Sequence, residues 1–208
     1  MVYEILPEFE PLLDRNENCI GWLTVDDTKI DYPVVQTIDD PIEYLYLDFD
    51  GKSNQNGTLI LDEFSVSGVG TAEFDYRDGV SPSTNLIIYG HTMKSGAMFG
   101  YLNKFATKSY GMEHNIIQYD SLYEHREYEL ISCFYSQIFY SWEDVFKFYN
   151  FHQADTQEEF DDWYDNIMDM ALYDTGVTAE FGDEFITLVC CSYQVEDGRF
   201  VVVGKRIA

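Results

Sequence analysis

Positive charge is scarce in this sequence. Its 208 residues include 12 Lys and Arg against 38 Asp and Glu, which gives a formal net charge of −26. Nucleic-acid binding needs Lys and Arg to neutralise phosphates, so this balance argues against a nucleic-acid partner. Docking to an anionic membrane surface is disfavoured for the same reason. Because no loop has the EF-hand ligand pattern, we interpret the excess of carboxylates as a solubilising surface.

Cysteine is also rare, and its placement limits its chemistry. The four cysteines are Cys19, Cys133, Cys190 and Cys191, too few and too scattered for a disulfide framework. Adjacent cysteines are poorly placed to bridge each other. The paired C-x-x-C spacing of structural zinc sites is missing, so we expect no metal site and no cofactor. Cys19 and Cys133 lie within apolar segments and are predicted to belong to the core.

Long apolar runs are absent as well. No stretch of about 18 apolar residues could form a membrane-spanning helix, and no signal peptide opens the chain. We find no repeat, low-complexity tract or linker, and 46% apolar composition is enough for one substantial core. The sequence therefore predicts a single domain over residues 1–208.

Aromatic residues, by contrast, are abundant at 17% of the chain, which favours strands over a helical bundle. Short β-prone segments alternate with turn-rich ones such as Asn56-Gly57 and Asp197-Gly198. Many short strands without regular helical alternation predict a mainly β fold, a barrel or sandwich that is mostly antiparallel. The eight expected strands span residues 20–25, 30–36, 58–61, 86–89, 115–119, 128–138, 185–191 and 200–206.

Three helical segments interrupt this pattern. The first, within residues 3–16, contains Pro7 and Pro11 and is expected to be short and broken. A second short helix is expected at 99–106. The longest, at 156–173, lies between the sixth and seventh strands and begins with a capping-box match from Thr156 to Glu159. Its apolar residues recur at spacings of three and four, so we expect it to pack on the sheet.

The C-terminal pair of strands carries the most informative residues. If the two strands form an antiparallel hairpin around Val195, Cys191 lies opposite Arg199 on the same face. A guanidinium there favours the thiolate form of cysteine. It could also donate a hydrogen bond to a carbonyl oxygen that becomes negative during acyl transfer. Cys190 points to the opposite face and is predicted to be a small buried side chain.

His91 is the candidate acid and base. It follows the strand at 86–89 through Gly90, and imidazole changes charge near neutral pH. The other three histidines, His114, His125 and His152, are predicted to be solvated surface side chains. Cysteine, histidine and arginine at three strand ends form a candidate site for nucleophilic chemistry.

At these positions the sequence resembles the sortases, cysteine transpeptidases of Gram-positive bacterial surfaces. Their signature is Thr-Leu-x-Thr-Cys at the end of one strand, with an arginine at the start of the next. Residues 187–191 match four of its five positions, Arg199 matches the arginine, and Tyr89-Gly90-His91 matches the strand-end histidine. Segments that resemble class B sortases are Gly21-Trp22-Leu23, residues 30–36, Tyr44-Leu45 and the helix between the sixth and seventh strands.

The resemblance implies an eight-stranded sortase-type β-barrel with an N-terminal helix and a defined reaction. Cys191 would attack the threonyl carbonyl of a C-terminal sorting-signal pentapeptide and form a thioacyl enzyme. His91 would protonate the leaving amine and deprotonate the incoming one, while Arg199 would hold the substrate backbone or the oxyanion. Expected substrate-binding residues are Leu45, Val189 and Cys190. The family's threonine is replaced by Cys190, which removes a hydroxyl near the substrate.

The resemblance also implies partners and location. The substrates would be surface proteins with a sorting signal, and the acceptor would be an amine of a cell-wall precursor. The enzyme would act outside the cytoplasm, held by an N-terminal membrane anchor that this sequence does not include, so we expect a trimmed ectodomain. Three alternatives stay open: a class B pilin polymerase that uses a pilin lysine, a hydrolase whose acceptor is water, and a catalytically inactive scaffold of the same fold.

Overall fold

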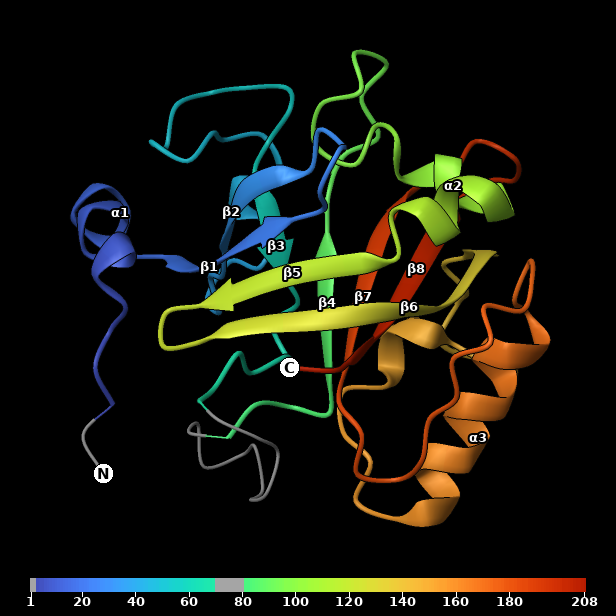
Figure 1. Cartoon of the computed structure of the whole chain (residues 1–208). Helices are drawn as coiled ribbons and strands as arrows, with labels where there is room; N and C mark the ends of the chain where they lie inside the picture. The colour runs from blue at the N-terminus through green and yellow to red at the C-terminus, as the bar shows by residue number, and fades with distance from the viewer. Residues whose placement is uncertain (1–2, 70–80) are drawn as a thin grey trace.

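Eight strands form a closed barrel. The computed structural model describes residues 3–69 and 81–208. Around the barrel the strand order is β1-β2-β3-β4-β7-β8-β6-β5 (Figure 1). The strands are β1 (Cys19–Thr24), β2 (Asp31–Val35), β3 (Leu59–Leu61), β4 (Asn85–Tyr89), β5 (Ile116–Ser121), β6 (His125–Gln137), β7 (Phe185–Cys191) and β8 (Gly198–Arg206). The predicted mainly β barrel is confirmed, and each predicted strand end lies within three residues of the observed one.

Most neighbouring strands are antiparallel, as predicted, but two pairs are parallel. These are β2 with β3 and β4 with β7. Side chains alternate between the two faces of a strand, so the sequence predicts which of them share a face. This alternation carries no information on the direction of a distant partner strand. The parallel pairing of β4 with β7 decides where the candidate site forms, because parallel strands end at the same edge.

The two largest apolar clusters lie on the two faces of the barrel wall. The inner one fills the barrel with side chains such as Leu23, Ile88 and Phe200. The outer one lies between the wall and α3 (Gln157–Asp169), which follows β6 and precedes β7 (Figure 1). In this outer cluster Trp163 stacks on Phe151, with ring centroids 4.3 Å apart. The helix therefore covers the outer face of the sheet, as its apolar stripe predicts.

The helix α3 starts where predicted and ends earlier. Both hydrogen bonds of the capping box between Thr156 and Glu159 are present. The predicted end at residue 173 is wrong, because the chain leaves the helix at Met170 to reach the barrel. There Leu172 donates its backbone N–H to the carbonyl of Cys133, and the Tyr173 hydroxyl donates to that of Phe105.

The remaining helices are short. Within the predicted segment 3–16, only η1 (Pro7–Phe9) and α1 (Glu10–Arg15) are helical, as its two prolines predict. The helix expected at 99–106 is the 3-10 helix η4 (Leu102–Ala106), and α2 (Lys108–Glu113) follows it without having been predicted. Two further 3-10 turns are η2 (Glu43–Leu45) and η5 (Phe148–Asn150).

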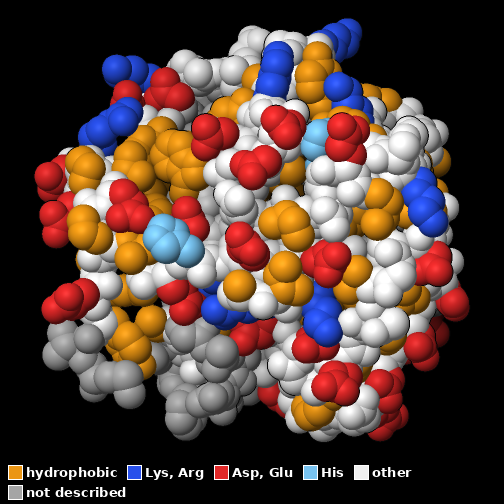
Figure 2. Space-filling model, viewed as in Figure 1, with side chains coloured by type: hydrophobic (Ala, Val, Ile, Leu, Met, Phe, Trp, Pro, Cys, Tyr) orange, Lys and Arg blue, Asp and Glu red, His pale blue; other side chains and the backbone are white. Residues whose placement is uncertain are grey.

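The excess negative charge is dispersed over the face of the molecule that Figure 2 shows. In Figure 2 the carboxylate side chains are spread among polar and apolar ones over the visible face. This distribution agrees with a solubilising role, since dispersed charge keeps a protein soluble. Among the described residues, no helix combines the length and apolar character needed to cross a bilayer.

Candidate active site

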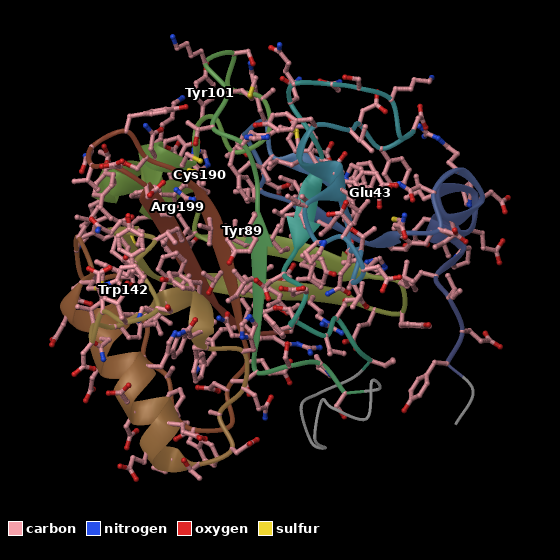
Figure 3. The ribbon with its side chains drawn as sticks, turned by 180° about the vertical axis from the view of Figure 1, so that it is seen from behind. Glu43, Tyr89, Tyr101, Trp142, Cys190 and Arg199 are labelled. Carbon is pink, nitrogen blue, oxygen red and sulfur yellow. The ribbon has the colours of Figure 1, made fainter. Side chains whose placement is uncertain are left out.

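Three strand ends meet at one edge of the barrel. Strands β4 and β7 run parallel with Tyr89 opposite Val189, so both strands end at that edge. Strand β8 runs antiparallel to β7 and starts there, with Arg199 opposite Cys191. The predicted hairpin register of Cys191 and Arg199 is confirmed. Figure 3 shows Tyr89, Cys190 and Arg199 on these neighbouring strands. His91, two residues beyond β4, therefore comes next to the end of β7.

The two adjacent cysteines have different surroundings, as strand alternation predicts. Cys190 belongs to the inner cluster and is only 2% exposed. Burial raises the pKa of its thiol to about 11, so it stays protonated at neutral pH. Cys191 alternates to the outer face and is half-buried. The structure thus separates one buried thiol from one accessible thiol. Cys19 and Cys133 are buried, as predicted.

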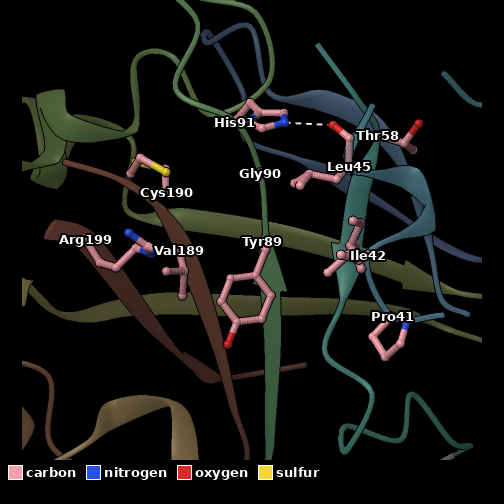
Figure 4. A pocket seen from close by; sticks show the side chains of 12 residues that line it. Pro41, Ile42, Leu45, Thr58, Tyr89, Gly90, His91, Val189, Cys190 and Arg199 are labelled. Atoms are coloured by element: carbon pink, nitrogen blue, oxygen red, sulfur yellow. Dashed lines mark hydrogen bonds between the residues drawn. The ribbon is translucent and has the colours of Figure 1, made fainter. Parts of the chain in front are cut away.

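A pocket of about 290 Å³ opens over these strand ends. All six predicted site residues line it, namely Leu45, His91, Val189, Cys190, Cys191 and Arg199. Figure 4 labels all of them except Cys191. Pro41, Ile42 and Ile60 add further apolar surface. We name this hollow the thiol pocket. Its apolar walls, with a thiol and a guanidinium among them, suit an extended peptide that presents a carbonyl to Cys191.

Tyr89 contributes a neutral side chain to the thiol pocket. Its phenol is mostly buried, and this burial, with nearby Asp62 as a smaller cause, raises its pKa. The phenol therefore keeps its proton at neutral pH. We infer that Tyr89 shapes the pocket and exchanges no proton in the reaction.

The guanidinium of Arg199 is held by its own turn. Its Nη1 donates to the backbone carbonyls of Asp197, at 3.1 Å, and Gly198, at 2.9 Å. No carboxylate among residues 3–69 and 81–208 forms an ion pair with Arg199, although the chain has 38 acidic residues. Its positive charge is therefore not neutralised locally. The remaining N–H groups are free to donate to an anionic oxygen in the thiol pocket.

His91 is fixed by a segment that sequence reasoning did not connect with it. Its Nε2 lies 2.7 Å from the carbonyl oxygen of Leu45 (Figure 4). A carbonyl oxygen only accepts hydrogen bonds, so Nε2 carries the proton and Nδ1 is left to exchange one. The ring of Tyr46 lies against the imidazole, with centroids 5.4 Å apart. The two residues 45 and 46 together therefore orient the imidazole.

Thr92 ties the loop after β4 to the strand that carries Cys191. Its hydroxyl donates to the carbonyl oxygen of Cys191 at 2.7 Å. The backbone N–H of Gly90 donates to the carbonyl of Val189 at 3.1 Å and extends the parallel pairing by one residue. Sequence reasoning missed the roles of Leu45 and Thr92 as supports. For Thr92, its position next to His91 was the only signal in the sequence. For Leu45 there was none, because every residue has a backbone carbonyl.

The other histidines lie elsewhere. His125 is exposed and pairs with Asp120, as expected for a surface residue. His114 follows α2, with its ring against Tyr110. The prediction of a solvated surface was wrong for His152, whose side chain is only 11% exposed and whose Nε2 lies 2.8 Å from Asp62. The segment after η5 brings His152 onto the end of β3, a contact that local sequence does not encode.

No cluster of three or more His, Cys, Asp or Glu side chains converges in residues 3–69 or 81–208. The arrangement at the barrel edge therefore consists of a thiol, an imidazole and a guanidinium around one apolar pocket. Such a set is suited to acyl transfer through a cysteine nucleophile.

Known proteins with similar sequence and structure are sortases. No protein-family model matches the chain. Sortase B of Listeria monocytogenes serovar 1/2a is 30% identical over 210 residues, which cover 98% of this chain and 76% of that protein. The crystal structure of sortase B from B. anthracis in complex with AAEK1 is 30% identical, with a TM-score of 0.78, over 100% of this chain and 88% of that one.

A more distant structure agrees in fold. The Staphylococcus aureus sortase B–substrate complex is 23% identical, with a TM-score of 0.79, and the match covers 98% of this chain and 86% of that chain. At this identity the likeness concerns the fold alone. The matches span nearly the whole of the present chain, so the similarity includes the barrel, the strand ends and α3 together.

Proposed function

Because the chain belongs to the class B sortases, a family of cysteine transpeptidases, we propose that it cleaves the C-terminal sorting signal of surface proteins and transfers them to an amine. Cleavage falls after the threonine of a pentapeptide, and Cys191 carries the thioacyl intermediate. The acceptor is the amine of a cell-wall precursor, and the reaction takes place at the cell surface, outside the cytoplasm.

Cys191 and His91 share the proton movements of the reaction. The Cys191 thiolate attacks the threonyl carbonyl, and the tetrahedral intermediate expels the downstream amine, which takes a proton from the His91 imidazolium. The incoming amine then attacks the thioester carbonyl and gives a proton to His91. The C–S bond breaks, and Cys191 leaves as thiolate. Both residues regain their starting forms, so no other proton donor or acceptor is consumed.

Arg199 stabilises the oxygen that becomes negative in both tetrahedral intermediates. Its guanidinium has no carboxylate partner in the described part of the chain, and two carbonyls of its own turn fix its position. Removing one such hydrogen-bond donor typically lowers kcat by about 10²–10³. A fixed cation beside the thiol also favours the thiolate over the thiol.

One observation supports this proposal more strongly than any other. Cys191 and Arg199 lie opposite each other in the β7–β8 pair, next to the turn that joins the two strands. His91 lines the same thiol pocket. Leu45, Val189 and Cys190 would bind the side chains of the sorting signal. Cys190 stands where the family has threonine, and in this proposal it contributes apolar wall in place of a hydroxyl.

Cleavage of peptides by the purified protein tests the proposal. A library of threonine-containing pentapeptides, each followed by a short downstream segment, is incubated with the protein and analysed by mass spectrometry. We expect cleavage after threonine in a small subset, and Cys191→Ala abolishes it. Cys133→Ala serves as the matched control, because it removes a buried thiol far along the chain from the site. Cleavage that persists in Cys191→Ala would exclude this mechanism.

The products separate the alternative functions. Amide products with an added amine indicate transfer, while a free threonyl carboxylate alone indicates a hydrolase. A preference for a lysine side chain over a cell-wall peptide amine would indicate pilin polymerisation. Absence of any cleavage product would indicate a catalytically inactive scaffold.

A further inference from the structure

Asp62 and His152 form a buried pair that the proposed reaction does not use. Nε2 of His152 lies 2.8 Å from Oδ1 of Asp62, and the two side chains are only 11% and 15% exposed. A carboxylate only accepts hydrogen bonds, so Nε2 donates to Asp62. The ring of Phe64 lies against the imidazole, with centroids 5.6 Å apart. Burying an ionisable pair costs desolvation energy, so stability alone is a weak reason for such a pair.

The strand register places Asp62 beside Tyr89. Strands β3 and β4 are antiparallel with Ile60 opposite Tyr89, and the backbone N–H of Asp62 donates to the carbonyl of Ile87 at 2.8 Å. Asp62 is therefore the diagonal neighbour of Tyr89 on the same face, within reach of a long aromatic side chain. Figure 4 shows the Tyr89 hydroxyl at the end of its ring that points away from His91. Asp62 forms a hydrogen bond with this phenol.

The turn that carries Asp62 is fixed by several hydrogen bonds. Nε2 of Gln36 donates to the backbone carbonyls of Asp62 and Ser65, both at 2.8 Å. The backbone N–H of Ser65 donates to the carbonyl of Asp62 at 3.0 Å. Oδ1 of Asp62 accepts the backbone N–H of Phe64 at 2.9 Å, in addition to the imidazole of His152. The carboxylate therefore cannot turn without losing two donors.

The carboxylate also decides the direction of the hydrogen bond at Tyr89. A carboxylate cannot donate, so the phenol proton points to Asp62 and the phenol oxygen keeps its lone pairs. Because Tyr89 lines the thiol pocket, the pocket meets an acceptor there. Arg199 lines the same pocket and interacts electrostatically with Tyr89, which disfavours a cation next to this oxygen. The group that complements the phenol is therefore a neutral N–H or O–H donor.

We propose that Asp62 and His152 are positioning residues, which hold the Tyr89 phenol so that its oxygen accepts a hydrogen bond from a neutral donor of the bound peptide. This inference rests on the proposed function. His152 acts through Asp62, and Asp62 acts through Tyr89. The three residues exchange no proton with the substrate, so they affect binding of the donor peptide and leave the chemistry at Cys191 unchanged.

A double-mutant cycle in kcat/KM tests the inference. The donor is the peptide of the library that the wild-type protein cleaves fastest. Tyr89→Phe removes the hydroxyl and should lower kcat/KM roughly threefold to tenfold, the effect of one hydrogen bond, through KM with kcat unchanged. Asp62→Ala should cause a similar loss in the wild-type protein. In Tyr89→Phe it should cause a loss of less than about twofold, because no hydroxyl is left to orient.

His152 allows rescue by a conservative variant. His152→Leu removes the donor to Asp62 and should raise KM roughly threefold, whereas His152→Gln keeps a side-chain N–H and should retain the wild-type KM. His125 and Asp120 are the matched controls, because they form a pair of the same 2.8 Å length that is exposed and lines no part of the thiol pocket. His125→Leu and Asp120→Ala should keep the wild-type KM.

The rate at which a small methanethiosulfonate labels Cys191 is measured in every variant. This rate reports the thiol itself, which the inference leaves unchanged, so all variants should match the wild-type protein. A slower rate in Asp62→Ala, together with a lower kcat, would indicate a general structural role and would overturn the inference.

The cycle separates the inference from the proposed function. If Asp62→Ala causes the same loss in the wild-type protein and in Tyr89→Phe, Asp62 does not act through the phenol and the inference is overturned, while cleavage leaves the proposed function standing. Equal losses in the controls, or no rescue by His152→Gln, overturn it as well. If Asp62→Ala does not fold, His152→Leu takes its place in the cycle. If the wild-type protein cleaves no peptide, the proposed function fails and the inference fails with it.

Discussion

The carbonyl oxygen of Leu45 lies 2.7 Å from Nε2 of His91, so the segment between β2 and β3 fixes the imidazole that follows β4. This hydrogen bond assigns the ring proton to Nε2 and leaves Nδ1 for proton exchange. It also makes the position of a main-chain atom part of the candidate catalytic geometry. Side-chain substitution at Leu45 cannot remove the carbonyl, but substitution of a glycine that packs against this carbonyl can displace it.

Gly57 lies directly behind that carbonyl. It has φ of +63°, and a Cβ atom there would come within 2.5 Å of the Leu45 oxygen. We expect Gly57→Ala to displace the carbonyl, release His91 and lower kcat roughly tenfold to hundredfold, since small misplacements of a catalytic group have effects of this size. Steady-state kinetics with a cleavable donor peptide measure it.

Gly51→Ala is the matched control for that substitution. Gly51 has φ of +73°, and no atom lies within 4 Å of its added Cβ. Both variants carry similar backbone strain, of about 1–2 kcal/mol for a non-glycine residue with left-handed dihedrals. Only Gly57→Ala moves the carbonyl, so an equal kcat in the two variants would contradict the role of the Leu45–His91 hydrogen bond.

Thiol reactivity should distinguish the two adjacent cysteines. Cys191 is half-buried at the thiol pocket, whereas Cys190 is buried and its pKa is raised to about 11 by that burial. The thiolate is the reactive form, so at pH 8 a small methanethiosulfonate should add once per native molecule, at Cys191. Peptide mapping by mass spectrometry locates the label. Two labels on the pair, or persistent single labelling after Cys191→Ala, would be incompatible with this assignment.

Arg199 should not be replaceable by lysine. Its guanidinium donates to two carbonyls of its turn and still has N–H groups directed elsewhere, which a single ammonium on a flexible stem cannot reproduce. We expect Arg199→Lys to lower kcat by about 10²–10³, the usual effect of losing one oxyanion donor. Arg15→Lys is the control, because Arg15 pairs with Asp50 away from the thiol pocket. Retention of more than a third of the activity in Arg199→Lys would speak against an oxyanion contact.

His125 should make folding stability depend on pH. Its hydrogen bond with Asp120 raises its pKa in the folded protein, with a smaller contribution from Glu8. A raised folded-state pKa gives stability that is present below the unfolded value, near 6.5, and lost as pH rises through the folded value. The side chain is 64% exposed, so the contribution is discounted to below about 1 kcal/mol.

Calorimetry at two pH values measures this contribution. His125→Gln should lower Tm by about 1–3 °C at pH 5.5. In a chain of this size, a loss of somewhat less than about 1 kcal/mol in the free energy of unfolding corresponds to such a shift. At pH 8.5, where the imidazole is neutral, Tm should match that of the wild-type protein. Asp120→Asn removes the charged partner and should give the same pattern. A larger loss of stability at pH 8.5 than at pH 5.5 would reverse the expected sign.

The strands and the hairpin pair were predictable from local sequence. Alternating burial specifies which residues share a face, and turn residues such as Asp197-Gly198 specify where β7 and β8 separate. Cys191 and Arg199 are close along the chain, so these local rules suffice to place them opposite each other. The start of α3 was predictable for the same reason, because a capping box needs only Thr156 and Glu159.

The arrival of His91 beside Cys191 depends on tertiary structure. It requires the parallel pairing of β4 with β7, between residues about a hundred positions apart, and no local pattern encodes the direction or register of such a pair. The contact of the Leu45 carbonyl with His91 and the burial of His152 also depend on tertiary structure. Side-chain periodicity records which way a residue faces, whereas the backbone has the same chemistry at every position. Sequence therefore determined the candidate nucleophile and its arginine, and only the folded chain decided what orients the histidine beside them.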